Sequence, residues 1–181
     1  VLDRIAAAVE QSGMRGIISF EATERRTHAE GARGTKESER FIRKIKKKSM
    51  SRVRGMFSIH ASFTVSDELF HYVRELASRY KVPVTIHTSE GLVDLYHNLG
   101  RFGKRTIERL NDEGLLAQDV VLAHCVHVND DELTIIKKTG AKVALRDPRA
   151  ISFMEALKMA TIRGAELYGL GNELGSIEHG K

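Results

Sequence analysis

Cysteine is almost absent from this sequence, and its scarcity excludes several kinds of site. The 181 residues contain one cysteine, Cys125, so the chain has no internal disulfide and no Cys-x-x-Cys pair for a structural zinc or a redox motif. A reducing compartment fits this composition. Cys125 follows His124 at the end of an apolar run with no positioned base evident, so we expect it to pack in the core rather than act as a nucleophile.

Long apolar runs and targeting signals are also missing. No stretch is long and apolar enough to cross a bilayer, so we expect no association with a membrane. The first residues, VLDRIAAAVEQSGMRG, show an amphipathic helical pattern that ends in glycine, and they lack the charged start and apolar stretch of a signal peptide. We therefore expect a cytoplasmic protein.

Aromatic residues are few where positive charge is dense. The formal net charge is +5, and a basic cluster, RFIRKIKKKSMSRVRG, occupies residues 40–55. Such a cluster suits either nucleic acid or a solvated helix end, but it has few aromatic side chains on which bases could stack. Because cations in the last turn of a helix stabilise its dipole, we favour the helix end and do not expect a nucleic-acid partner.

The sequence does contain a regular alternation of strand-like and helical segments. Apolar, β-branched runs predict strands at 16–20, 54–60, 82–87, 119–124 and 141–145. Helical patterns separate them, and the pattern at 66–80 begins with an N-cap serine and carries one apolar face. This alternation predicts a parallel sheet, either doubly wound or closed into a barrel.

Three consecutive predicted strands end in histidine, at His60, His87 and His124. The carboxyl ends of parallel strands form the mouth where ligands and catalytic groups gather, so we expect these side chains to converge. Convergence from several successive strands suits a barrel better than a doubly wound sheet, whose site lies at one switch point. The sequence therefore favours an α/β barrel.

Histidines at such a mouth indicate metal chemistry. Neutral imidazole is the commonest side-chain ligand for zinc, and a catalytic zinc site leaves one position open for water. Hydrolysis also needs a carboxylate that takes a proton from water and delivers it to the leaving group, and Glu90, three residues after His87, suits that role. Taken singly, His28, His71 and His97 are better explained as buried structural side chains.

Four segments carry a family resemblance: GMFSIHASFTVSDELF, VPVTIHTSEGLVDLYHNLGRFGKRTIERLNDEGLL, DVVLAHCVHVNDDEL and EALKMATIRGAELYGLGNELGSIEHGK. Over nearly the whole chain the sequence resembles the amidohydrolase superfamily, in the branch of guanine and cytosine deaminases, aminohydrolases and triazine chlorohydrolases. The resemblance implies a metal-dependent-hydrolase type TIM barrel.

The resemblance also implies a role for each strand-end residue. His87 would be the metal ligand and Glu90 the proton-shuttling acid of the family's His-x-x-Glu motif. His124 would orient the hydrolytic water or stabilise the charge that develops during attack, and His60 would contact the substrate. The implied cofactor is a divalent metal, zinc first, with iron or manganese as alternatives.

Two family features are missing from these residues. The His-x-His pair that supplies two ligands from the family's first strand does not occur. After Leu145 the family continues with a loop and then a strand whose aspartate is a further ligand, whereas here Leu145 runs directly into RDPRAISFMEALKMATIRGAELYGL. We interpret the junction at 145–146 as a deletion, a gap closed up in the numbering or an assembly artefact, and the chain as an incomplete record of a larger enzyme.

By the resemblance, residues 1–145 correspond to a partial barrel of about five βα units, the third to seventh strands of eight. Residues 146–181 correspond to the C-terminal barrel helix and the start of a small β-domain. A chain with so few metal ligands is expected to bind a divalent metal weakly and to be inactive on its own.

The leading functional prediction is metal-dependent hydrolysis of a carbon–nitrogen bond, in the form of deamination of a small-molecule nitrogen heterocycle by metal-activated water. Chlorohydrolysis or the opening of a cyclic amide would use the same machinery. From a different class, the chain could be a catalytically dead, basic nucleic-acid-binding or scaffolding module. That alternative leaves the retention of the strand-end residues unexplained. The sequence is compatible with a homo-oligomer and does not determine the oligomeric state.

Overall fold

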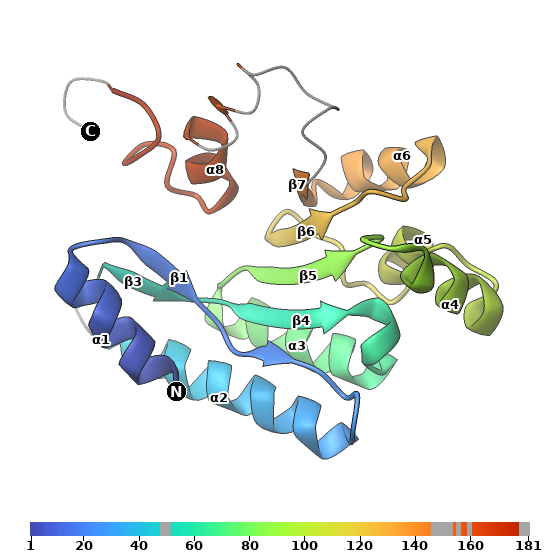
Figure 1. The fold of residues 1–181 in the computed structure, drawn as a ribbon, viewed down its shortest axis with the longest axis horizontal. Helices are drawn as coiled ribbons and strands as arrows, with labels where there is room; N and C mark the ends of the chain where they lie inside the picture. Colours follow the sequence, from blue (N-terminus) through green and yellow to red (C-terminus); the bar gives the residue numbers. More distant parts are fainter. Residues whose placement is uncertain (48–51, 146–153, 155–156, 159–160, 178–181) are drawn as a thin grey trace.

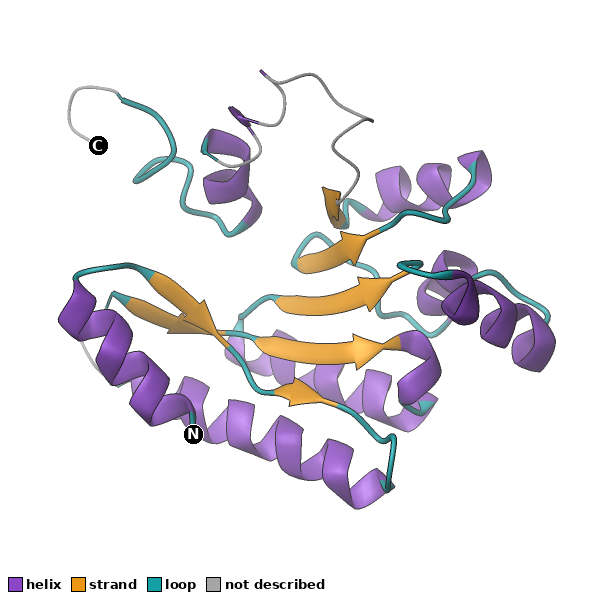
Figure 2. Cartoon of the chain, in the orientation of Figure 1, coloured by secondary structure: helices purple, strands orange, loops and turns teal. Residues whose placement is uncertain are grey.

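Parallel strands and their connecting helices form the frame of the computed structural model, which describes residues 1–47, 52–145, 154, 157–158 and 161–177 (Figure 1). One sheet contains, in spatial order, β2 (Glu21–Ala22), β4 (Phe57–Ala61), β5 (Val84–Thr88), β6 (Val120–His124) and β7 (Lys142–Leu145). All of its pairings are parallel, and Figure 2 shows the arrows of β4, β5 and β6 pointing the same way. The spatial order follows the chain order without the reversal that marks a doubly wound sheet, so this arrangement matches one wall of a barrel.

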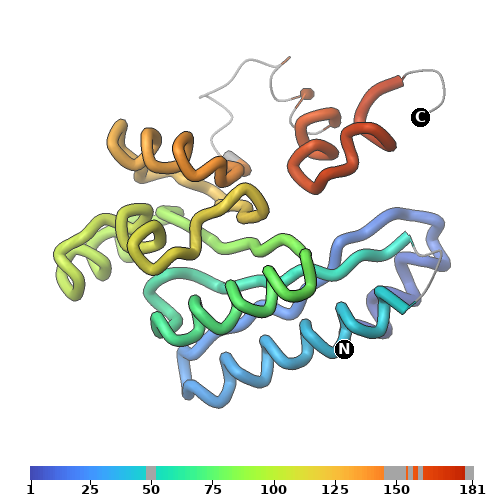
Figure 3. Tube along the Cα trace, turned by 180° about the vertical axis from the view of Figure 1, so that it is seen from behind, coloured from blue at the N-terminus to red at the C-terminus, as the bar shows by residue number. Residues whose placement is uncertain are grey.

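Helices precede or connect these strands. They are α1 (Leu2–Ser12), α2 (His28–Lys46), α3 (Asp67–Tyr80), α4 (Leu92–Phe102), α5 (Thr106–Asp112), α6 (Asp130–Thr139) and α8 (Ile162–Leu167), with a short 3-10 turn, η1 (Ser62–Thr64), after β4. Helices α2 and α3 run side by side along one face of the strands in Figures 1 and 3. The core lies between these layers, where Phe57, Ile86 and Leu122 of the strands meet Phe70 of α3 and Leu110 of α5.

The predicted start and stop signals of the helices are confirmed. Ser66 precedes α3, and its side chain accepts a hydrogen bond from the backbone N–H of Leu69. Helix α1 is followed by the expected glycine, Gly13, whose φ of 74° lies in the left-handed region that favours glycine. The basic residues Arg43 and Lys44 lie in the last turn of α2, as expected of a helix end.

Two predicted strands are each interrupted. In segment 16–20 the strand β1 (Gly16–Ile18) ends early and β2 follows after the segment, while segment 54–60 gives β3 (Val53–Gly55) and then β4. Strands β1 and β3 pair as a separate two-stranded sheet. The break between β1 and β2 has its cause on α2, because the Ser38 hydroxyl accepts from the backbone N–H of Phe20 and donates to its carbonyl. Both peptide groups of Phe20 are thereby withdrawn from strand pairing.

The predicted junction at 145–146 and the first residues after it lie outside the described residues, as do residues 48–51 of the basic cluster. Of the predicted C-terminal region, α8 is described, and the Lys142 ammonium of β7 donates to the carbonyls of Glu166 and Leu167 at its end. Among the described residues we find no helix with the length and apolar character needed to span a membrane.

Candidate active site

Histidines lie at the carboxyl ends of three neighbouring strands. His124 is the last residue of β6, and His87 of β5 stands opposite Ala61 of β4. His60 lies in β4 where the register shifts by one residue, an irregularity that re-aims a side chain. The parallel register therefore carries all three imidazoles to one edge of the sheet, as the strand endings predicted.

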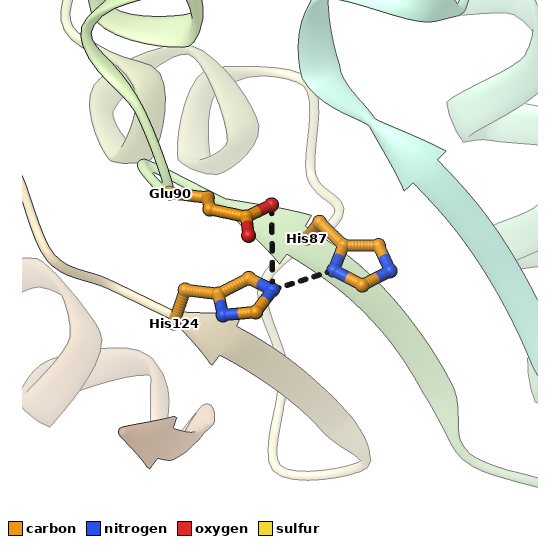
Figure 4. A group of neighbouring side chains, drawn as sticks. All are labelled: His87, Glu90 and His124. Carbon is orange, nitrogen blue, oxygen red and sulfur yellow. Dashed lines mark hydrogen bonds and ion pairs between the residues drawn. The ribbon is translucent and has the colours of Figure 1, made fainter. Parts of the chain in front are cut away.

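His87, Glu90 and His124 form a group that we call the strand-end cluster (Figure 4). His87 Nδ1 lies 2.7 Å from His124 Nε2, and the two rings stack with centroids 4.9 Å apart. Glu90 Oε2 lies 3.5 Å from the same His124 nitrogen. As Figure 4 shows, the Glu90 carboxylate and the His87 ring both point toward His124 Nε2.

Proton placement within the cluster follows from a second carboxylate. The Glu21 side chain, at the start of β2, places Oε1 3.1 Å from His87 Nε2, and an ionised carboxylate only accepts hydrogen bonds. When both rings are neutral, His87 therefore donates from Nε2 to Glu21 and accepts at Nδ1 from His124 Nε2. In this arrangement His87 would offer Nδ1 to a metal, and His124 would bind through Nε2 in its other tautomer, with the proton moved to Nδ1.

The donor set of the strand-end cluster fits a divalent metal. One imidazole nitrogen from each histidine and one Glu90 oxygen all lie within 4.8 Å of one another. Tetrahedral zinc with bonds of about 2.1 Å separates its ligand atoms by about 3.4 Å. The observed separations of 2.7 and 3.5 Å lie on either side of that value, so an ion held by His87 would have His124 and Glu90 within reach of its other positions, including that of a bound water. Imidazole and carboxylate together suit zinc, iron or manganese.

Access to the cluster is uneven. The Glu90 side chain is 46% exposed, whereas that of His124 is 15% exposed. A small molecule would therefore reach the cluster from the Glu90 side, with His124 forming its inner wall.

His60 borders the cluster, with its ring centroid 5.8 Å from that of His87. Its Nδ1 lies 3.0 Å from Thr64 Oγ1, and the Arg25 guanidinium donates to its Nε2 at 3.0 Å. Burial lowers the pKa of His60, and the charge of Arg25 lowers it further. His60 is thus held neutral beside the cluster.

Sequence reasoning missed Glu21 and Arg25, the two side chains that contact His87 and His60. Glu21 directly follows the run GIISF, as the strand-end histidines close theirs, whereas Arg25 lies in the loop beyond it. A signal was therefore present, because polar residues directly after a parallel strand reach the same edge.

Other side chains confirm or correct the expectations from sequence. Cys125 is buried, and burial raises the pKa of its thiol to about 12, so the expected packing role is confirmed. His97 is half-buried between Phe63 and Phe102. His28 and His71 were expected to be buried, and this was wrong: both are exposed and lie beside glutamates on the surface.

Comparisons with known proteins agree with this arrangement. A model of the amidohydrolase family matches the chain in two stretches, residues 1–150 and 140–181. The sequence is 29% identical over 240 residues to a 5'-deoxyadenosine deaminase of Methanobrevibacter smithii, covering 99% of this chain and 54% of that protein. It is 33% identical over 143 residues to a 5-methylthioadenosine/S-adenosylhomocysteine deaminase of Thermococcus kodakarensis, covering 79% of this chain and 34% of that protein.

Solved structures show the same fold. An adenosine deaminase from Xanthomonas campestris with bound zinc superposes with a TM-score of 0.84 at 20% identity, over 96% of this chain and 52% of that one. An atrazine chlorohydrolase from Arthrobacter aurescens, in complex with zinc and atraton, gives a TM-score of 0.83 at 18% identity, over 99% and 54%. The predicted partial barrel is confirmed, and the chain spans about half the length of the curated relatives that it matches over its whole extent.

Proposed function

This chain belongs to the amidohydrolase family, and from that premise we propose that it carries part of the active site of a hydrolase that deaminates a nitrogen heterocycle. The observation that carries the proposal is the strand-end cluster, in which two imidazoles and a carboxylate meet at the carboxyl ends of adjacent parallel strands. Parallel topology brings the strand ends to this edge, but it does not explain why three neighbouring strands carry histidine there or why a carboxylate joins two of the rings.

The substrate class is argued from the relatives. Those named above are deaminases of 5'-deoxyadenosine and of 5-methylthioadenosine or S-adenosylhomocysteine, all of which contain an adenine ring. We therefore propose a purine nucleoside or a similar amino-substituted heterocycle as the substrate.

The residues of the strand-end cluster have different chemical roles. His87 would hold a divalent metal, which when bound supplies the Lewis acidity that lowers the pKa of water. Zinc is favoured, since related folds have been crystallised with it. Glu90 takes a proton from the attacking water and delivers it to the leaving amine, so that the carbon–nitrogen bond breaks, ammonia departs and the ring carbon keeps the oxygen.

The two remaining histidines act on the water and the substrate. His124, on the inner wall, orients the water and stabilises the charge that develops during attack. His60 contacts the heterocycle, and the contact from Arg25 keeps its ring fixed.

The division of the chain is also a proposal. We assign residues 1–145 to the partial barrel and residues 146–181 to the last barrel helix and the start of a small β-domain. Two facts support a junction between them: the family model matches in two stretches that overlap at residues 140–150, and the alignment with the Methanobrevibacter protein runs over 240 residues, more than the 181 of this chain. We place the protein in the cytoplasm and leave its assembly as a homo-oligomer to measurement.

The test is ammonia release by the complete protein that contains this chain, loaded in turn with zinc, iron and manganese. Adenosine, 5'-deoxyadenosine, 5-methylthioadenosine and S-adenosylhomocysteine are the substrates, and a chlorinated triazine assayed for chloride release is the competing arm. Release of ammonia from at least one purine nucleoside is expected. Chloride release alone, or no product from the folded, metal-loaded protein, would overturn the proposal.

A further inference from the structure

The backbone beside the strand-end cluster is strained. Ser89, His124 and Cys125 have φ values of 49°, 75° and 50°, in the left-handed region that residues other than glycine rarely adopt. Such conformations persist only where the surrounding structure holds them, and they gather at functional sites. Ser89 is of most interest because it directly precedes Glu90.

Three hydrogen bonds hold the turn at Thr88 and Ser89. The carbonyl of Thr88 accepts from the Cys125 N–H at 2.9 Å, and the carbonyl of Ser89 accepts from the His127 N–H at 3.0 Å. The N–H of Ser89 donates to Oδ2 of Asp94, at 2.7 Å. Two of these bonds come from the backbone after β6, so the third is the one that a side chain controls.

Asp94 lies on the first turn of α4 and is 2% exposed. Its Oδ1 accepts from Ser62 Oγ and from the Asn98 amide at 3.0 Å. Both partners are completely buried and neutral. Burial raises the pKa of Asp94, the expected cost of a carboxylate whose hydrogen bonds come from neutral groups.

The position of Asp94 joins two strand ends. Ser62 begins the turn after β4, two residues beyond His60, and Ser89 lies in the turn after β5, next to Glu90. One carboxylate therefore bonds both turns that carry site residues. If it served packing alone, an amide or an apolar side chain would fill the space without the desolvation cost.

We propose that Asp94 is a positioning residue, which fixes the Ser89 turn to the turn after β4 and so sets the direction in which Glu90 reaches the reacting atoms. This inference rests on the proposed function for its effect on turnover, but the tie between Asp94 and Ser89 can be tested without any activity.

The test compares Asp94→Asn with Glu132→Gln. Glu132 is a second buried carboxylate, and its hydrogen bonds go to Arg105 and to the backbone N–H groups of Ile107 and Asn129 at the starts of α5 and α6. Both variants keep the shape of the side chain and remove its charge. They differ in that Asp94 bonds the Ser89 turn directly and Glu132 does not.

The first readout is hydrogen exchange at the Ser89 amide, measured on the complete protein that contains this chain, without metal or substrate. Asp94→Asn should speed exchange at Ser89 at least about tenfold relative to core amides such as that of Ile86, whereas Glu132→Gln should leave that ratio unchanged. Equal ratios in the two variants would overturn the inference, whatever the activity. If Asp94→Asn does not fold, Ser62→Ala, which removes one donor to Asp94, is measured in its place with the same expectation.

The second readout is steady-state kinetics of the complete protein. Asp94→Asn should lower kcat about tenfold to a hundredfold while leaving KM and metal content unchanged, because a misdirected general acid slows the chemical step without weakening binding. A normal kcat in Asp94→Asn, alongside a strongly reduced kcat in Glu90→Gln, would overturn the inference and leave the proposed function intact. Loss of metal from Asp94→Asn would also overturn it, since Asp94 would then support the metal rather than aim Glu90.

Discussion

The strand-end cluster and the buried polar network beneath it differ in almost every physical respect. The cluster is partly open to solvent and combines two imidazoles with an exposed carboxylate. The buried network, made of Ser62, Asp94, Asn98 and Arg109, is closed to solvent, and each member bonds another. Groups that exchange protons with a substrate must be reachable, whereas groups that fix geometry work best where water cannot compete. The comparison therefore assigns chemistry to the first region and positioning to the second.

The largest expected effect is at Glu90 in the cluster. Glu90→Gln keeps the shape of the side chain but removes its proton-transfer capacity, so turnover by the complete protein should fall about a hundredfold to ten-thousandfold while metal content stays near normal. Glu75→Gln, an exposed glutamate on α3, is the matched control and should leave turnover unchanged. Metal analysis showing an empty site in Glu90→Gln would make Glu90 a ligand instead.

A large effect of a different kind is expected at Arg109 in the buried network. Its guanidinium donates to the Ser62 carbonyl, to Asn98 and to Asp67, and lies 3.8 Å above the Phe102 ring. Arg109→Ala should lower the free energy of unfolding by about 2–4 kcal/mol, because it leaves the buried Ser62 carbonyl and Asn98 side chain without a donor and breaks an ion pair whose Asp67 side is partly exposed. Urea denaturation gives the value, and a loss below about 1 kcal/mol would show that this network carries little stability.

A smaller loss is expected at Glu132. Glu132→Gln should cost about 1.5–3 kcal/mol, the range for hydrogen bonds to a charged group, since the buried carboxylate accepts from Arg105 and from two helix starts. Zinc affinity should not change. If zinc affinity also fell in Glu132→Gln, then Glu132 on α6 would be one of the residues that position the strand-end cluster.

The sequence predicted the cluster better than the network, for a physical reason. Strand endings at His60, His87 and His124 follow from local patterns, and parallel topology brings strand ends to one edge whatever the details. Asp94 looked like an ordinary polar residue at the start of a helix, because its partners Ser62 and Ser89 are brought to it only by folding. The break between β1 and β2 also depended on a long-range contact, that of Ser38 with Phe20.

The smallest expected effect is a pH dependence that comes from Asp94. Its pKa is raised in the folded state from the ordinary 3.8, so between these two values the folded chain holds a proton that the unfolded chain has released. The stability of the wild-type chain relative to that of Asp94→Asn should therefore be greatest at low pH and fall as pH rises from about 3.8 through the raised pKa of Asp94. Urea midpoints across this interval provide the measurement, with the exposed Asp112→Asn as control. If the stability of the wild-type chain rose with pH relative to that of Asp94→Asn, the raised pKa of Asp94 would be contradicted.

The role of the strand-end cluster is tested most directly by a calorimetric titration of the 181-residue chain with zinc. The zinc affinities of His87→Ala and His71→Ala are compared with that of the parent chain. The two histidines are both accessible, with side chains 40% and 60% exposed, but only His87 belongs to the cluster. We predict that the parent chain binds zinc weakly and that His71→Ala has the same zinc affinity. In His87→Ala the zinc affinity should fall by more than the roughly tenfold to hundredfold that is lost when a residue that only hydrogen-bonds a metal ligand is removed. Equal zinc affinity in His87→Ala and the parent chain would contradict the assignment of a metal site to this edge of the sheet.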